Sequence, residues 1–113
     1  MHEYSIVASL VERVERELRP GATVRALHVR IGELAGVEVE LLRTAFATFR
    51  EHTACDGAEL AIELVPASWT CPSCKRAIAR GAVLRCPDCN RPATLAAGDD
   101  IILERIEMEV RDV

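Results

Sequence analysis

Two Cys-x-x-Cys pairs constrain this 113-residue chain more than any other feature. The first pair is Cys71 and Cys74, and the second pair, Cys86 and Cys89, follows after eleven residues. A hairpin that brings the two pairs together would offer four thiolates in the tetrahedral arrangement that Zn²⁺ prefers. A proline follows the first cysteine of each pair and fixes φ where the chain must turn around the ion. The spacing therefore predicts a closed, structural metal site.

Other uses of paired cysteines are less consistent with the sequence. Two disulfides would need an oxidising compartment, and the first residues carry acids without the apolar stretch of a signal peptide. A redox pair is usually a single Cys-x-x-Cys at the start of a helix. Iron held by the same four thiolates, as in a rubredoxin-type electron carrier, remains an alternative. The fifth cysteine, Cys55, has no obvious partner and is interpreted as a free thiol.

Composition excludes several classes of protein. Half of the residues are hydrophobic, which is enough for a small core, but no run of 18 apolar residues is present that could span a membrane. The formal net charge of −4 argues against a nucleic-acid partner, although basic residues gather around the cysteines. No pairing of a nucleophile with a base is apparent, so the chain is not expected to be an enzyme and no catalytic residue is predicted.

Hydrophobic periodicity predicts two helices and three principal strands. The helices are expected at residues 4–19, with Ser5 as a candidate cap, and 38–53. The strands are expected at residues 23–31, 59–66 and 99–110. Residues 77–79 and 82–84 flank Arg80 and Gly81, which favour a hairpin turn. Because the last two principal strands flank the cysteine segment, we expect them to be antiparallel neighbours.

The predicted fold class is α+β. Two helices pack on a small mixed three-stranded sheet, which carries an inserted four-cysteine zinc-ribbon-like module. Residues 1–66 and 98–113 would form the α+β domain, and residues 67–97 the zinc-binding module. His28 lies in a predicted strand and His52 in the last turn of a predicted helix, where a cation suits the helix dipole. Neither histidine is expected to bind a metal.

The N-terminus is a second candidate metal site. Met1 offers an α-amine, His2 an amide and an imidazole, and Glu3 an amide and a carboxylate. The amine and the His2 amide close a five-membered chelate ring, and the His2 amide and imidazole close a six-membered one. Such nitrogen donors suit square-planar Ni(II) or Cu(II). A histidine beside a terminus is by itself a weak signal, and residue 2 is expected to precede the first helix without core contacts.

Taken together, these features resemble the HypA/HybF family of hydrogenase nickel-incorporation proteins. The resemblance rests on residues 1–3, 29–46, 57–67 and 98–110 and on the two Cys-Pro-x-Cys pairs, in order along nearly the whole chain. It implies a cytoplasmic nickel metallochaperone that binds Ni(II) at its N-terminus for the maturation of [NiFe]-hydrogenase, and of urease in some organisms. The implied partners are the GTPase HypB and the hydrogenase large subunit, and a homodimer is left open.

The resemblance also implies roles for individual residues. His2 would be the essential nickel ligand, with Glu3 beside it, and the four paired cysteines would hold structural Zn²⁺. Lys75 and Asn90 depart from the family, whose members often have glycine after the second cysteine of each pair. The alternative function is a zinc-ribbon module that binds nucleic acid or protein and has no role in nickel delivery.

Overall fold

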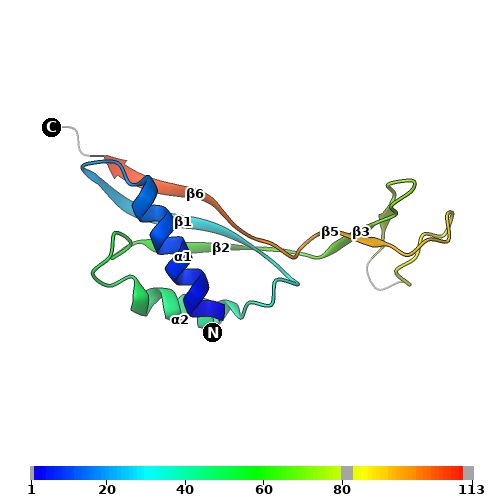
Figure 1. Cartoon of the computed structure of the whole chain (residues 1–113), viewed down its shortest axis with the longest axis horizontal. Coiled ribbons are helices and arrows are strands. Elements are labelled where there is room, and N and C mark those ends of the chain that lie inside the picture. Colours follow the sequence, from blue (N-terminus) through cyan, green and yellow to red (C-terminus); the bar gives the residue numbers. More distant parts are fainter. Residues whose placement is uncertain (1, 80–82, 111–113) are drawn as a thin grey trace. The chain divides into compact units, whose positions relative to one another are not determined.

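The computed structural model describes residues 2–79 and 83–110, without the side chain of His2. Its contacts divide the chain into two compact units. The first unit is built from residues up to Arg30, from Val37–Glu63 and from Ile102 onward, and the second from Ile31–Gly36 and Leu64–Ile101. Figure 1 labels the elements of both units, each of which is described by itself below. The predicted division into an α+β domain (residues 1–66 and 98–113) and a zinc-binding module (residues 67–97) stays a prediction.

The first unit contains two helices and a mixed three-stranded sheet, which confirms the predicted α+β class. The helices are α1 (His2–Glu17) and α2 (Val39–Phe49). The strands are β1 (Ala22–Gly32), β2 (Glu59–Val65) and β6 (Ile101–Val110). Buried apolar residues of both helices and of β1 form the core of this unit.

The strand order is β2-β1-β6, with β1 in the middle (Figure 1). The expectation that the strands before and after the cysteine segment are neighbours is therefore wrong. β1 contributes five residues to the buried core, more than any other strand, and the central position removes both of its edges from water. β1 and β6 run antiparallel, since Arg25 pairs with Glu109 at one end and Arg30 with Glu104 at the other.

Helix α1 begins at His2, two residues before the predicted start, and ends at Glu17. The expectation that residue 2 precedes the first helix is wrong. Glu3 lies in the first turn, where a carboxylate interacts favourably with the positive end of the helix dipole. The buried stripe of α1 consists of Val7, Leu10, Val11 and Val14, as periodicity predicts. Leu18, which the same periodicity adds to the stripe, lies beyond the end of the helix and is only partly buried.

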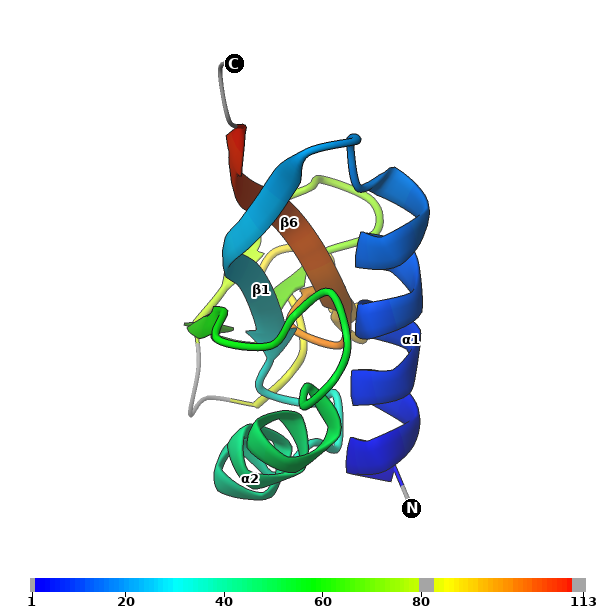
Figure 2. The same ribbon diagram turned by 90° about the vertical axis from the view of Figure 1, so that its left-hand side faces the viewer.

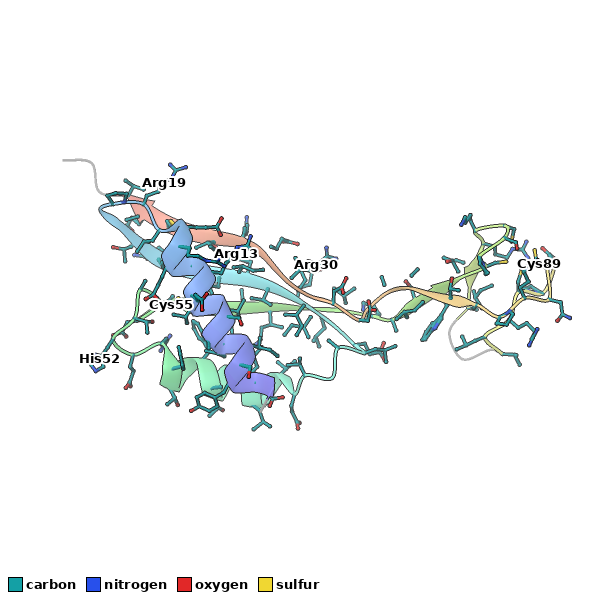
Figure 3. All side chains as sticks on the ribbon, viewed as in Figure 1. Arg13, Arg19, Arg30, His52, Cys55 and Cys89 are labelled. Atoms are coloured by element: carbon teal, nitrogen blue, oxygen red, sulfur yellow. The ribbon has the colours of Figure 1, made fainter. Side chains whose placement is uncertain are left out.

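Helix α2 buries Leu42, Ala45 and Phe46 and ends at Phe49, four residues before the predicted end. It stops early because Thr53 turns back and both its amide and its hydroxyl donate to the Arg50 carbonyl. His52 lies in the following turn with φ at +64°, so its predicted place in the last helical turn is wrong. Figure 3 shows His52 at the periphery of this turn.

The two helices of the first unit meet at the first turns of α1. Figure 2 shows α2 almost end-on beside the first turns of α1. The rings of Tyr4 on α1 and Phe49 on α2 meet edge-on with centroids 6.5 Å apart. The first turn of α1 therefore belongs to the packed part of the unit rather than to a loose terminus.

The second unit contains a smaller sheet of three short strands. These are β3 (Ser68–Thr70), β4 (Ala77–Ile78) and β5 (Thr94–Ala97), in the order β4-β3-β5. The predicted hairpin turn at Arg80 and Gly81 lies outside the described residues. The described partner of β4 is β3, with Trp69 opposite Ile78, and periodicity identified neither β3 nor β5.

Three backbone segments of the second unit come together around Gly32 and Gly98. The hydrogen bonds run from Gly32 N–H to Asp100, from Glu33 N–H to Val65, from Leu34 N–H to Gly98 and from Ala67 N–H to the Glu33 carboxylate, at 2.7–2.9 Å. A Cβ on Gly32 would lie 2.2 Å from the Gly98 carbonyl carbon, and a Cβ on Gly98 2.5 Å from the Ala67 Cα. Both positions therefore require glycine.

We expect Gly32→Ala to destabilise the protein by about 2–3 kcal/mol or more, because the added methyl overlaps backbone that cannot move away. Gly98→Ala should cost more still, since Gly98 also has φ at +105°. Gly36→Ala is the matched control: its φ is +76° but a Cβ there meets nothing within 4 Å, so it should cost only about 1 kcal/mol. Urea unfolding of the zinc-loaded proteins measures the three values, and an equal loss in all three would contradict the steric explanation.

Candidate metal centres

The first cysteine pair lies in a tight loop between β3 and β4. The Cys71 N–H donates to the Arg76 carbonyl at 2.9 Å, and the Lys75 N–H donates back to the Cys71 carbonyl at 3.0 Å. These two bonds close the loop and turn the sulfurs of Cys71 and Cys74 to the same side. Backbone hydrogen bonds thus define the geometry of this loop.

The second cysteine pair repeats this arrangement. The Cys86 N–H donates to the Arg91 carbonyl and the Asn90 N–H to the Cys86 carbonyl, both at 2.9 Å. An antiparallel bridge between Arg85 and Pro92 closes the loop from outside. Two similar loops therefore face each other across the space between them.

All four sulfur atoms lie within 4.8 Å of one another. The Sγ atoms of Cys74 and Cys86 are 3.8 Å apart, which matches the edge of about 3.8 Å expected for a tetrahedron with Zn–S bonds of about 2.3 Å. Cys71 and Cys86 are buried against Ile78, with Trp69 and Ala93 packed around them. Figure 3 labels Cys89 in this group. The predicted cluster is thus present in the structure.

The electrostatics of the cluster also favour a bound cation. The pKa of Cys71 is lowered to about 6, chiefly because the Cys74 N–H hydrogen-bonds to its sulfur. The pKa of Cys89 is raised to about 12, chiefly by its hydrogen bond with the Cys74 side chain. Without a cation the four sulfurs cannot all be thiolates, whereas a divalent ion would stabilise the negative charge on each of them. The donor set therefore fits Zn²⁺.

Two residues of the loops have left-handed backbone. Lys75 has φ at +64° and Asn90 has φ at +54°, each directly after the second cysteine of its pair. Asparagine adopts this conformation readily, whereas lysine does so at a cost of roughly 1–2 kcal/mol. The departure from glycine at Lys75 therefore leaves more backbone strain in the first cysteine loop than the departure at Asn90 leaves in the second.

Lys75→Gly should tighten zinc binding by about 0.5–1 kcal/mol. Glycine removes the steric strain of the Cβ, but the greater conformational entropy of the unfolded loop offsets part of this gain. Asn90→Gly is the control and should gain less. Competition with a chromophoric chelator measures both affinities. A larger gain at Asn90 than at Lys75 would contradict the explanation.

Replacing Cys74 and Cys86 together with alanine should release zinc and unfold the cysteine loops. Metal binding contributes on the order of 10 kcal/mol in small zinc sites, whereas the core around the cysteines contains little besides Ile78. The helices of the first unit should persist. Elemental analysis and far-ultraviolet circular dichroism test both statements, and one zinc still bound per chain would contradict the role of these cysteines.

The N-terminal candidate lies only partly within the described residues. Met1 and the side chain of His2 are outside them. The Glu3 side chain is buried, with 8% of its surface exposed, and its Oε2 accepts the Glu38 N–H at 3.3 Å. The amides of His2 and Glu3 lie in the first turn of α1, where N–H groups have no partner within the helix.

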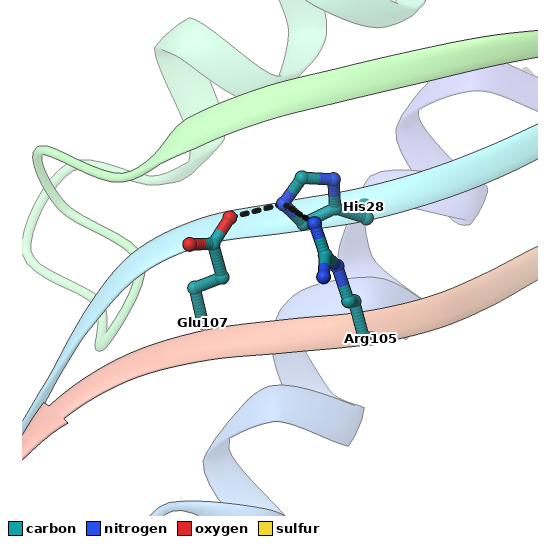
Figure 4. A network of polar contacts seen from close by, with 3 residues as sticks. All are labelled: His28, Arg105 and Glu107. Carbon is teal, nitrogen blue, oxygen red and sulfur yellow. Dashed lines mark hydrogen bonds and ion pairs between the residues drawn. The ribbon is translucent and has the colours of Figure 1, made fainter.

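His28 belongs to an ion network on the sheet. Its Nε2 contacts the Glu107 carboxylate, and Arg105 lies 3.4 Å from the same nitrogen (Figure 4). The hydrogen bond from His28 lowers the pKa of Glu107. Among the described residues, 2–79 and 83–110, only the four paired cysteines form a group of three or more metal-ligating side chains close enough to share an ion. His28 is not part of such a group.

Cys55 is buried in the first unit, and Figure 3 shows it beside α1. Its thiol is free. Burial, and secondly the charge of Glu15, raises its pKa to about 11. The thiol therefore stays protonated and unreactive at neutral pH.

Alkylation of the native, zinc-loaded protein at pH 8 should leave Cys55 unmodified, because its pKa of about 11 leaves very little thiolate at that pH. Chelating the zinc should expose the other four cysteines but not Cys55, and urea should expose all five. Mass spectrometry of digested protein assigns each site. Modification of native Cys55 at the rate of a free cysteine would contradict this interpretation.

Comparison with known proteins now places the chain in a family. The family model described as "Hydrogenase/urease nickel incorporation, metallochaperone, hypA" matches residues 1–108. The chain belongs to the HypA family. The family predicted from the sequence is thus confirmed, and within the described residues no helix is both long and apolar enough to cross a membrane.

Individual relatives match over their full length. A hydrogenase maturation factor HypA from Shewanella baltica is 34% identical over 113 residues, which cover 96% of this chain and 97% of that protein. The protein of the same name from Campylobacter jejuni is 37% identical over 114 residues, covering 96% and 100%. Both relatives are thus named as hydrogenase maturation factors.

Two solved structures share the fold. The solution structure of the Ni metallochaperone HypA from Helicobacter pylori has a TM-score of 0.67 at 27% identity and covers 96% of this chain and 98% of that one. A second solution structure of a HypA protein has a TM-score of 0.76 at 28% identity and covers 98% of each chain. With the four-cysteine cluster, this similarity supports structural zinc and a nickel cargo.

Proposed function

We propose that this chain is a nickel metallochaperone that binds Ni(II) at its N-terminus and delivers it for the maturation of [NiFe]-hydrogenase. Urease is a second acceptor in this proposal. The observation that carries it is the HypA family match along residues 1–108, which includes the Met1-His2-Glu3 terminus. The role is binding and delivery, without catalysis.

The proposed nickel ligands are the Met1 α-amine and the amide and imidazole nitrogens of His2, with Glu3 beside them at the next position. The start of α1 at His2 supports this set, since first-turn amides are not occupied by helical hydrogen bonds. An amide nitrogen that is free of such a bond can exchange its proton for a metal ion. Nitrogen donors in one plane select Ni(II) or Cu(II) over the zinc that prefers a tetrahedron.

The two metals have different roles in this proposal. Cys71, Cys74, Cys86 and Cys89 hold zinc in a site whose four positions are filled by sulfur, so zinc stays bound and stabilises the loops. A delivery protein needs a second site from which its ion can leave. A chelate at the chain terminus can be approached by an acceptor from several sides, which a buried sulfur cluster does not allow.

The proposed partners are the GTPase HypB and the large subunit of [NiFe]-hydrogenase, in the cytoplasm. The free cysteines support a reducing compartment, because no disulfide joins any of the described cysteines. Self-association into a homodimer is also proposed, and sedimentation velocity tests it. Nucleic acid is not a proposed partner: Arg76, in the first cysteine loop, is paired with Asp88 in the second at 2.6 Å.

His2→Ala should abolish high-affinity nickel binding and leave the zinc content unchanged. His52→Asn is the matched control, since asparagine tolerates the left-handed backbone of that exposed position. An N-terminal extension should also weaken binding, because it converts the α-amine into an amide. Nickel binding should weaken in acid, because protons compete with nickel for the amine, imidazole and amide nitrogens.

Isothermal titration of untagged protein with Ni²⁺ measures these effects. The free amine is tested by running the extended form beside the processed one. Wild-type affinity in His2→Ala would overturn the N-terminal nickel site. Unchanged affinity in the extended form alone would remove only the amine from the ligand set.

A further inference from the structure

Glu3 is the one buried charged side chain among the described residues, with 8% of its surface exposed. It belongs to the first turn of α1, yet its carboxylate reaches the start of a different helix. Its Oε2 accepts the backbone N–H of Glu38, the residue that precedes α2, at 3.3 Å. A buried carboxylate is costly unless it is hydrogen-bonded, so this contact must contribute to holding the two helices together.

Helix α2 lacks a cap of its own. Its N-cap residue is Glu38, in extended conformation with φ −86° and ψ 111°, and the Glu38 side chain makes no capping hydrogen bond. The first N–H groups of a helix need acceptors, and a negative charge there also suits the helix dipole. Glu3 supplies both from α1. The cap of α2 is therefore provided by the residue next to the proposed nickel ligand His2.

The neighbouring residue secures the same turn of α1. Tyr4 meets Phe49 near the other end of α2, with ring centroids 6.5 Å apart. Glu3 and Tyr4 thus fix the first turn of α1 at both ends of α2. The backbone amides of His2 and Glu3 lie in this fixed turn, so the metal would meet amides that are already ordered.

We propose that the Glu3 carboxylate is a positioning group for nickel and not a nickel ligand. The carboxylate keeps its hydrogen bond with the Glu38 N–H at the start of α2 and so fixes the turn of α1 that contains His2. The inference rests on the proposed function, because it concerns the same nickel site. In this proposal the Met1 amine and the amide and imidazole of His2 would hold nickel at three corners of a square plane. The fourth corner would take an exchangeable ligand such as water or a donor of the acceptor protein.

Three substitutions of Glu3 separate positioning from ligation. In Glu3→Gln, the side-chain oxygen accepts the same N–H without a charge, so nickel affinity should stay within about threefold of wild type. In Glu3→Asp, the charge remains but the side chain is too short to reach Glu38, and in Glu3→Ala the acceptor is gone. Both should bind nickel about tenfold more weakly, as expected for loss of a helix cap. Glu12→Gln, on the exposed side of α1, is the matched control.

The absorption spectrum of bound nickel reports its ligands directly, so it separates a change of ligand from a change in stability. If the fourth corner is open, added imidazole should shift the bands of wild type and Glu3→Gln alike. If the carboxylate were a ligand, Glu3→Gln would lose affinity and change the bands before imidazole is added. Amide hydrogen exchange of metal-free protein reports the cap independently, with faster exchange at Glu38 in Glu3→Ala but not in Glu3→Gln.

Each outcome has a definite meaning. Wild-type affinity in Glu3→Ala, or a loss of affinity in Glu3→Gln, would overturn the positioning role while the nickel site stands, provided that His2→Ala has lost nickel. Wild-type affinity in His2→Ala would overturn the nickel site and the positioning role together. Retained affinity in Glu3→Gln with weakened Glu3→Asp and Glu3→Ala is the result expected here.

Discussion

Four thiols within 4.8 Å of one another are the constraint on which the second unit depends. Such a cluster is stable only when a cation compensates the charge of the thiolates. The surrounding core is small, because Ile78 is the single buried aliphatic residue in the sulfur cluster. Zinc therefore stabilises the second unit, whereas burial of apolar side chains from both helices and β1 stabilises the first unit. Because all four positions of the sulfur site are filled, the proposed release of nickel has to occur from another site, and the proposed one is at the nitrogen donors of the N-terminus.

Periodicity and spacing predicted the elements that repeat regularly along the chain. The apolar stripes of both helices, the alternation of β1 and the cysteine cluster are all local patterns. The ends of the helices are not. Ser5 suggested a late start for α1, but Glu3 finds its partner in α2 and the helix begins earlier. α2 ends early because Thr53 competes for the Arg50 carbonyl, which periodicity does not register. Strands of two to four residues, such as β3 and β5, are too short to show alternation.

Contacts between distant segments account for what the sequence did not reveal. Gly32 and Gly98 resemble ordinary turn glycines in the sequence, yet each is required by close backbone approach within the second unit. The order of the three long strands depends on which strand has a neighbour on both sides, and that strand is β1. The rule that consecutive strands pair predicted β2 beside β6, which is wrong. The nickel ligands named from the sequence stay a prediction, because sequence alone does not separate a ligand from the carboxylate beside it.

The first unit contains two helix starts, and each presents N–H groups without a partner inside its helix. At α2 a carboxylate from the neighbouring helix satisfies one of these donors. At α1 the corresponding amides include those of His2 and Glu3, two of the residues proposed to form the nickel site. If Glu3 turned toward the metal, α2 would lose its cap at the moment of binding, and part of the binding free energy would be lost. A carboxylate that keeps its hydrogen bond to the start of α2 would avoid this loss, so in the proposed site one side chain would cap α2 and also hold the first turn of α1 in place.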